Sequence, residues 1–217
     1  IITVAMRRLD ITTKEHFFEN IDKKLTFLPN TAGCYTQKEA VLTAELSRES
    51  IQTNWLKLEL ISDQETLLPD PLELYNTSKE LIKKKFKIFA YCSDDPILCK
   101  RLEDIGCSAV MPMISPIGSG LGIRNEHNLE MIRKMCKGIV IVDAGIGKPS
   151  DASRVMELGF DGVLLNSSVA RSLDPVEMAE AMKLAVISGR KGFLSGIIEK
   201  TKKAVQTSNF SGKISNF

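Results

Sequence analysis

Short apolar segments alternate with helix-like segments along most of this chain, and the alternation constrains its fold more than any other feature. Helical spacing of apolar residues is clearest around Leu74, Leu81 and Ile82, and again around Met178 and Met182. Seven short segments have the length and composition of strands: Ile1–Met6, Leu25–Leu28, Trp55–Ile61, Lys87–Tyr91, Ala109–Met113, Ile139–Asp143 and Gly162–Asn166. Helix starts are predicted at Ser93–Pro96, Ser150–Asp151 and Asp174–Pro175, where capping residues occur. Repeated strand–helix units predict a parallel sheet covered by helices.

Two architectures fit this pattern, an open doubly wound sheet and a closed (βα)8 barrel. A closed barrel needs eight strands, one more than the sequence supplies. Because the chain enters a strand-like run at Ile1, we expect an α/β fold, a (βα)8 TIM barrel that lacks its first strand–helix unit in this chain. We predict that residues 1–192 form the barrel and that residues 193–217 form a polar tail with one short helix.

Composition argues against several classes of function. The formal net charge is only +2 and no basic stripe with aromatic residues occurs, so we expect no nucleic-acid partner. No apolar run reaches the roughly 18–20 residues of a membrane span. The chain has two histidines, far apart, and five cysteines without a CxxC pair: His16, His127, Cys34, Cys92, Cys99, Cys107 and Cys136. We therefore predict free thiols in a reducing compartment, no metal site and no cofactor.

Lys57 and Glu59 interrupt the apolar segment Trp55–Ile61 at alternate positions. Residues two apart on a strand share a face, so both charged side chains point the same way. A strand covered by helices is normally apolar on both faces, and a buried charge must be paired or functional. The alternative is an ion pair on an exposed sheet edge.

Two loops after consecutive strands predict a phosphate site. Ala144-Gly145-Ile146-Gly147 follows the strand that ends at Asp143, and Asn166-Ser167-Ser168 follows the next strand. Both loops open a helical segment, where glycine allows close approach and free N–H groups favour an anion. Barrels usually hold their ligands at this face. Ordinary glycine-rich turns are the alternative.

Other residues at this face allow more than one reading. The segment Ser115–Gly122 is rich in glycine and is either a loose connection or a lid that brings Gly118 to the phosphate. Asp143 is either a helix cap or a general acid and base. Arg7 and Arg8 follow the first strand and face either an anion or the solvent.

A lysine inside a barrel near a phosphate site is suited to form an imine with a phosphorylated ketone or aldehyde. The reaction needs a neutral amine, so the pKa of Lys57 must fall from about 10.4 to about 7.5. We expect burial to lower it. An ionised Glu59 would oppose that change, so we assign Glu59 to proton transfer in the bound complex and not to permanent pairing with Lys57.

At these residues the sequence resembles the thiazole synthase family, which builds the thiazole ring of thiamine. The resemblance extends to about Gly192 and includes these segments in the family's order: Leu28–Gly33, Leu56–Glu59, Leu67–Pro71, Ser93–Asp95, Met111–Pro112, Pro116–Gly120, Val142–Gly147 and Asp161–Asn166. It implies a (βα)8 barrel and the substrate 1-deoxy-D-xylulose 5-phosphate. Lys57 would form the Schiff base, with Glu59 and Asp143 as acid–base groups. The implied sugar-phosphate contacts are Gly118, Ala144, Gly145, Asn166 and Ser167, the last replacing a threonine of many members.

The resemblance also implies partners. Sulfur would arrive as the C-terminal thiocarboxylate of a small ubiquitin-like carrier protein, and dehydroglycine would supply the remaining ring atoms. The expected assembly is a homotetramer. The Lys- and Asn-rich composition resembles plastid-encoded algal copies, so the expected location is the cytoplasm, or the chloroplast stroma if the gene is plastid-encoded.

Two other functions use the same residues. A Schiff-base aldolase acting on a sugar phosphate would need the lysine and the phosphate site but no sulfur carrier. A non-catalytic module that binds a sugar phosphate or a carrier protein would need no imine.

Overall fold

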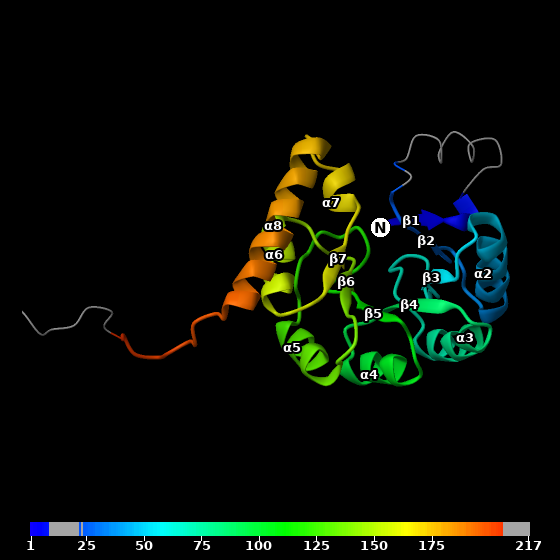
Figure 1. Cartoon of the computed structure of the whole chain (residues 1–217), viewed down its shortest axis with the longest axis horizontal. Coiled ribbons are helices and arrows are strands. Elements are labelled where there is room, and N and C mark those ends of the chain that lie inside the picture. The colour runs from blue at the N-terminus through cyan, green and yellow to red at the C-terminus, as the bar shows by residue number, and fades with distance from the viewer. Residues whose placement is uncertain (9–21, 23, 206–217) are drawn as a thin grey trace, which may run out of the picture.

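Parallel strands and surrounding helices make up the computed structural model, which describes residues 1–8, 22 and 24–205 (Figure 1). The strands are β1 (Ile2–Ala5), β2 (Phe27–Asn30), β3 (Trp55–Leu58), β4 (Lys87–Cys92), β5 (Ala109–Pro112), β6 (Ile141–Asp143) and β7 (Gly162–Leu164). The helices are η1 (Met6–Arg8), α2 (Gln37–Ile51), α3 (Pro71–Lys83), α4 (Pro96–Asp104), α5 (Glu126–Met135), α6 (Pro149–Glu157), α7 (Ser167–Ala170) and α8 (Pro175–Ser195). The predicted α/β class is confirmed.

The strands follow one another around the sheet in chain order. β1 to β5 form one parallel sheet, and β6 pairs with β7. A parallel bridge between Val110 and Val140 joins the two groups, and the N–H of Val110 donates to the carbonyl of Ile139 at 3.0 Å. Helices cover the outside of this curved sheet (Figure 1). The succession from β1 to β7 is the strand order of a (βα)8 barrel.

One seam interrupts the barrel, where β1 and β7 face each other. Among the described residues these two edges do not pair. A cavity of about 690 Å³ lies along the seam, lined mainly by apolar side chains that include Ile2, Met111 and Val186.

All seven predicted strands differ from the structure at one or both ends, and for two of them a hydrogen bond explains the difference. β3 ends at Leu58 because the backbone N–H of Glu59 donates to the hydroxyl of Thr31, at 2.8 Å, and not to a strand carbonyl. β2 begins two residues later than predicted, because the N–H of Leu25 closes a turn with the carbonyl of Asp22 at 2.9 Å.

The predicted helix starts are correct for two helices and displaced for the third. Asp95 caps α4 and Asp174 caps α8, each followed by proline. α6 begins at Pro149, so Asp151 lies in its first turn. The carboxylate of Asp151 there accepts hydrogen bonds from the N–H groups of Gly147 and Lys148 at 3.0 and 3.1 Å.

α8 extends to Ser195, into the range predicted as tail, and residues 206–217 of that range lie outside the described residues. Among helices in the described ranges, none has both the length and the apolar character needed to cross a membrane.

Apolar side chains fill one level of the barrel interior. Leu28, Phe89 and Met111 form a buried cluster, against which Trp55 and Ile141 pack. The rings of Trp55 and Phe89 lie 5.2 Å apart. A larger cluster, which includes Leu56 and Leu58, fills the space between the strands and the outer helices. β3 therefore contributes alternate residues to opposite sides, as its sequence predicts.

Candidate active site

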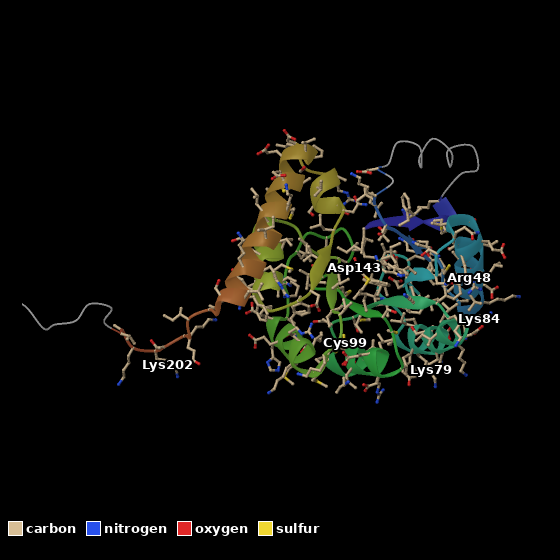
Figure 2. The ribbon with its side chains drawn as sticks, viewed as in Figure 1. Arg48, Lys79, Lys84, Cys99, Asp143 and Lys202 are labelled. Atoms are coloured by element: carbon tan, nitrogen blue, oxygen red, sulfur yellow. The ribbon has the colours of Figure 1, made fainter. Side chains whose placement is uncertain are left out.

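The inward positions become polar toward the carboxyl ends of the strands. Lys57 lies two residues after Trp55, Asn30 two residues after Leu28, and Asp143 two residues after Ile141. They open into a cavity of about 330 Å³. All the site residues predicted from the sequence line this cavity: Lys57, Glu59, Asp143, Gly118, Ala144, Gly145, Asn166 and Ser167. Figure 2 places Asp143 near the centre of the molecule, whereas Arg48, Lys79 and Lys84 lie toward the outer helices.

Lys57 lies between two carboxylates. Its Nζ is 2.6 Å from Oδ2 of Asp143 and 3.0 Å from Oε1 of Glu59. Lys57 and Glu59 are each only 5% exposed, so an ion pair on an exposed sheet edge is ruled out. Glu59 is thus paired with Lys57 in the structure, and its expected role in proton transfer in the bound complex stays a prediction. We call Lys57, Glu59 and Asp143 the charged triad.

The charged triad reverses the expected pKa of Lys57. Burial acts to lower that pKa, but the carboxylates of Asp143 and Glu59 outweigh burial and raise it above its ordinary value. The prediction of a lowered pKa is therefore wrong, because it considered one carboxylate and burial without the second carboxylate, contributed by β6.

Burial dominates at Asp143. It raises the pKa of this carboxyl group, and the nearby Lys57 only partly offsets the effect. Oδ2 of Asp143 is fully inaccessible and, apart from its ion pair, has no well-directed hydrogen-bond donor in the described part of the chain. Asp143 is thus a carboxylate that gains from taking up a proton, with a protonated amine 2.6 Å away.

Thr31 fixes the backbone at Glu59. Its hydroxyl accepts the N–H of Glu59 at 2.8 Å and donates to the carbonyl of Glu59 at 2.7 Å. Thr31 is fully buried at the end of β2. This pair of contacts joins β2 to β3 directly beneath the triad. The sequence motif Leu28–Gly33 contains Thr31, but the spacing of the motif does not reveal that role.

Tyr91 is a second neighbour that sequence reasoning missed. Its ring centroid lies 5.5 Å from Nζ of Lys57, which is within the range of a cation–π contact. Burial, followed by the charges of Asp143 and Glu59, raises the pKa of Tyr91, so the phenol stays neutral. Its position two residues after the inward-facing Phe89 was the available signal.

The glycine-rich segment Ser115–Gly122 packs closely on the loop after β6. The N–H of Gly122 donates to the carbonyl of Gly145 at 2.9 Å. A Cβ added to Gly145 would lie 2.1 Å from Oγ of Ser115, and Gly145 has a φ of +88°. Only glycine fits there without displacement. These contacts argue against a loose connection.

Gly118 lies at the point where the loops after β5 and β7 meet. A Cβ added there would be 3.5 Å from Oγ of Ser167 and 3.6 Å from Nη1 of Arg171. Nη1 of Arg171 also donates to the carbonyl of Gly118 at 3.5 Å. Arg171 therefore contacts a glycine that lines the cavity, although no sequence motif selects it.

No cysteine is among the described residues that line the cavity. All five are free thiols, as predicted, and Sγ of Cys92 lies 3.7 Å from Sγ of Cys99. Burial raises the pKa of Cys107 and that of Cys136 to about 12. Within the described residues, no group of three or more His, Cys, Asp or Glu side chains is arranged to hold a metal ion.

Comparison with known proteins gives consistent matches. The model of a family described as "Thiazole biosynthesis protein ThiG" matches residues 1–209. A thiazole synthase of Aquifex aeolicus is 53% identical over 215 residues, covering 98% of this chain and 80% of the relative. One from Geobacter sulfurreducens is 52% identical over 217 residues, covering 99% of this chain and 84% of the relative.

Solved structures agree on the fold. A chain in the crystal structure of the Amycolatopsis orientalis BexX/CysO complex superposes with a TM-score of 0.85 at 24% identity, covering 93% of this chain and 84% of that one. Phosphoribosyl anthranilate isomerase from Thermus thermophilus has a TM-score of 0.56 at 15% identity, covering 85% and 83%. At these identities the likeness concerns the fold, and it confirms the predicted TIM-barrel type.

Proposed function

Because the chain belongs to the family of thiazole biosynthesis protein ThiG, the thiazole synthases, we propose that it forms the thiazole phosphate moiety of thiamine through an imine on Lys57. Family membership makes it a sulfur-transferring biosynthetic enzyme. The proposed substrates are 1-deoxy-D-xylulose 5-phosphate, dehydroglycine and the C-terminal thiocarboxylate of a small ubiquitin-like carrier protein. The observation that carries the lysine assignment is the position of Nζ, inside the cavity and between two buried carboxylates.

The first proposed step is activation of the amine. Lys57 is charged in the unliganded site, so attack on the ketone requires removal of a proton. Asp143 is the acceptor that the geometry favours, since it lies 2.6 Å away and burial raises its pKa. A buried ion pair and its neutral counterpart differ less in free energy than the same pair in water. Proton transfer within the pair is therefore accessible once substrate occupies the cavity.

The second step forms the imine. The neutral Nζ attacks the ketone carbon, and one proton of the resulting ammonium passes to the former carbonyl oxygen to give a neutral carbinolamine. Protonated Asp143 then donates its proton to the departing hydroxyl, so that water leaves and a carbon–nitrogen double bond remains. The carboxylate of Asp143 is regenerated in this step.

Glu59 is the proposed base for the next proton transfer. Its Oε1 lies 3.0 Å from Nζ and so lies beside the carbon attached to that nitrogen. An iminium withdraws electrons from its neighbours, which makes the adjacent C–H acidic. Glu59 takes this proton, and the activated sugar carbon skeleton is then open to the sulfur donor.

The proposed phosphate contacts are the loops after β5, β6 and β7. Gly118, Ala144 and Gly145 all have positive φ, at +72°, +75° and +88°. Such turns direct backbone N–H groups into a concave surface that suits an anion. Asn166 and Ser167 add side-chain polar groups at the same end of the cavity.

Reduction with borohydride tests the lysine assignment. Incubation with 1-deoxy-D-xylulose 5-phosphate and borohydride should add the reduced sugar phosphate to the peptide that contains Lys57, as seen by mass spectrometry. Lys57→Ala should abolish the label, whereas Lys84→Ala should keep it, because Lys84 lies on the outer helices (Figure 2). Unchanged labelling in Lys57→Ala would refute the proposal. Cleavage of the sugar phosphate without any sulfur donor would favour the aldolase instead.

The assembly and location are also part of the proposal. α8 carries exposed apolar residues on its outer side, including Leu184 and Leu194, which are 57% and 69% exposed. Such residues support association with further copies of the chain, and we propose a homotetramer. Light scattering of the purified protein measures this directly. The proposed location is the cytoplasm, or the chloroplast stroma if the gene is plastid-encoded.

A further inference from the structure

Two consecutive arginines follow β1, and the structure gives them different surroundings. Arg7 and Arg8 both belong to the short helix η1, at the carboxyl end of the strand. The sequence left open whether either of them meets an anion. Their contacts in the structure indicate a different role for each.

Arg7 is held by the protein. Its Nη1 donates to the carbonyl of Gly33 and lies 3.8 Å from Sγ of Cys34. The same nitrogen is 3.8 Å from Oε1 of Glu39, close to the start of α2. These contacts attach η1 to the loop after β2, which is a structural role.

Arg8 has no such partners. It lines the same 330 Å³ cavity as Lys57, Glu59 and Asp143. Within the described ranges, no hydrogen bond or ion pair engages its guanidinium group. A guanidinium at the wall of a substrate cavity, free of protein partners there, has its donors available for a ligand.

The charged side chains that line the cavity indicate what kind of ligand Arg8 binds. The charged side chains of the described lining are Arg8 and the charged triad. Lys57 already lies within ion-pair distance of two carboxylates, so its charge is balanced by the protein. The triad has one ammonium and two carboxylates, so its net negative charge would repel an oxyanion that enters the cavity. Arg8 is then the cation of the described lining that remains to compensate it.

We propose that Arg8 binds an oxyanion of a substrate, either the phosphate of the ketose or the carboxylate of dehydroglycine. The inference rests on the proposed function for the identity of these two molecules. A planar guanidinium binds both groups with paired hydrogen bonds. Arg8 is thus a substrate-binding residue at the β1 side of the cavity, opposite in role to its neighbour Arg7.

Calorimetric titration of the full chain tests the proposal without requiring the imine. The titrants are 1-deoxy-D-xylulose 5-phosphate, unphosphorylated 1-deoxy-D-xylulose, and glyoxylate as a carboxylate probe. The variants are Arg8→Gln and Arg8→Lys, with Arg7→Gln as the control that loses the same charge one residue away. Loss of a charged hydrogen bond should weaken binding roughly 10- to 100-fold.

Each outcome has a definite meaning. If Arg8→Gln weakens binding of the phosphorylated ketose alone, and Arg8→Lys recovers part of it, the oxyanion is the phosphate. If it weakens binding of glyoxylate alone, the oxyanion is the carboxylate. Arg7→Gln should lower the melting temperature and change each affinity less than about twofold, since its partners are protein groups. Equal affinities of the parent and Arg8→Gln for all three titrants would overturn the inference. Borohydride trapping in the parent is scored separately, so a failure of the imine mechanism is not mistaken for a failure at Arg8.

Discussion

Nζ of Lys57 lies 2.6 Å from Oδ2 of Asp143, although β3 and β6 are separated by two intervening strands around the barrel. The contact joins the amine to a buried carboxylate whose pKa is raised by burial. In the proposed mechanism, this carboxylate is the group that takes the proton of the charged lysine before the amine attacks the ketone.

Replacing Asp143 by Asn should slow imine formation strongly. The amide keeps the size of the side chain but cannot accept the proton of Lys57, and loss of one general acid–base group typically costs about 10²- to 10⁴-fold in rate. The measurement is the rate of borohydride trapping in a single turnover, with circular dichroism to verify folding. A rate equal to that of the parent would remove Asp143 from the proposed step.

The pH profile of trapping provides a second readout for the same pair. In the parent, trapping should fall on the acid side at a pH above the ordinary Asp value, because burial raises the pKa of Asp143 and its base form is lost as pH decreases. In Asp143→Asn the amine must instead lose its proton to solvent. Its trapping rate should therefore increase with pH up to alkaline values. Parallel profiles for both proteins would contradict this assignment.

Replacing Lys57 by Met should make stability depend on pH in a defined direction. The variant leaves Glu59 and Asp143 buried without their cation, so a folded-state carboxyl pKa is raised further above its unfolded value. The folded state then binds more protons than the unfolded state near neutral pH, and the free energy of unfolding decreases as pH increases. Urea denaturation at pH 5 and pH 8 measures this slope. The variant should lose about 3–5 kcal/mol relative to the parent at pH 8. A deficit as large at pH 5 would argue against proton uptake.

Gly145→Ala should be more costly than the same change at Gly106. Both glycines have positive φ, at +88° and +96°, so both variants carry the backbone cost of roughly 1–2 kcal/mol. A Cβ at Gly145 would also meet Ser115, whereas nothing lies within 4 Å at Gly106. The added collision should cost about 1–3 kcal/mol more. Urea denaturation of the two variants gives the difference, and equal losses would show that the loop adjusts freely.

Thr31→Val should destabilise the protein and disturb the triad together. Valine has a similar shape but removes both hydrogen bonds to the backbone of Glu59, leaving a buried N–H without an acceptor at a cost of about 1–3 kcal/mol. Thr31→Ser keeps the hydroxyl and is the matched control. We expect lower stability and slower trapping in the valine variant only. Normal trapping in Thr31→Val would separate the position of Glu59 from this contact.

The alternation of short apolar segments with helix-like segments was enough to predict much of this architecture. It identified the approximate positions of the parallel strands, and the two-residue spacing of Lys57 and Glu59 predicted that both side chains point the same way, into the cavity that they line. The loops were also predictable, because parallel strands bring their carboxyl ends to one side. Strand ends were less predictable, since β3 stops at a side-chain contact from Thr31 that no local pattern encodes.

Contacts between residues far apart in sequence explain the remaining differences between the predictions and the structure. The direction in which the pKa of Lys57 shifts depends on Asp143. This residue is far from Lys57 along the chain, but the barrel brings its Oδ2 to within 2.6 Å of Nζ. Arg7 and Arg8 are identical in type and adjacent in sequence. Only the position of the loop after β2 determines which of them the protein holds.

Among the described residues, each strand from β3 to β6 is joined to the next, by ladder pairing from β3 to β5 and by the bridge between Val110 and Val140. Lys57 and Asp143 therefore stand on one continuous hydrogen-bonded arc, which holds the amine and its neighbouring carboxylate at a fixed separation. Arg8 and Ser167 follow β1 and β7, the two strands at the ends of the described order. The proposed proton transfer thus rests on shared backbone hydrogen bonds, whereas the proposed substrate contacts come from both ends of the strand order.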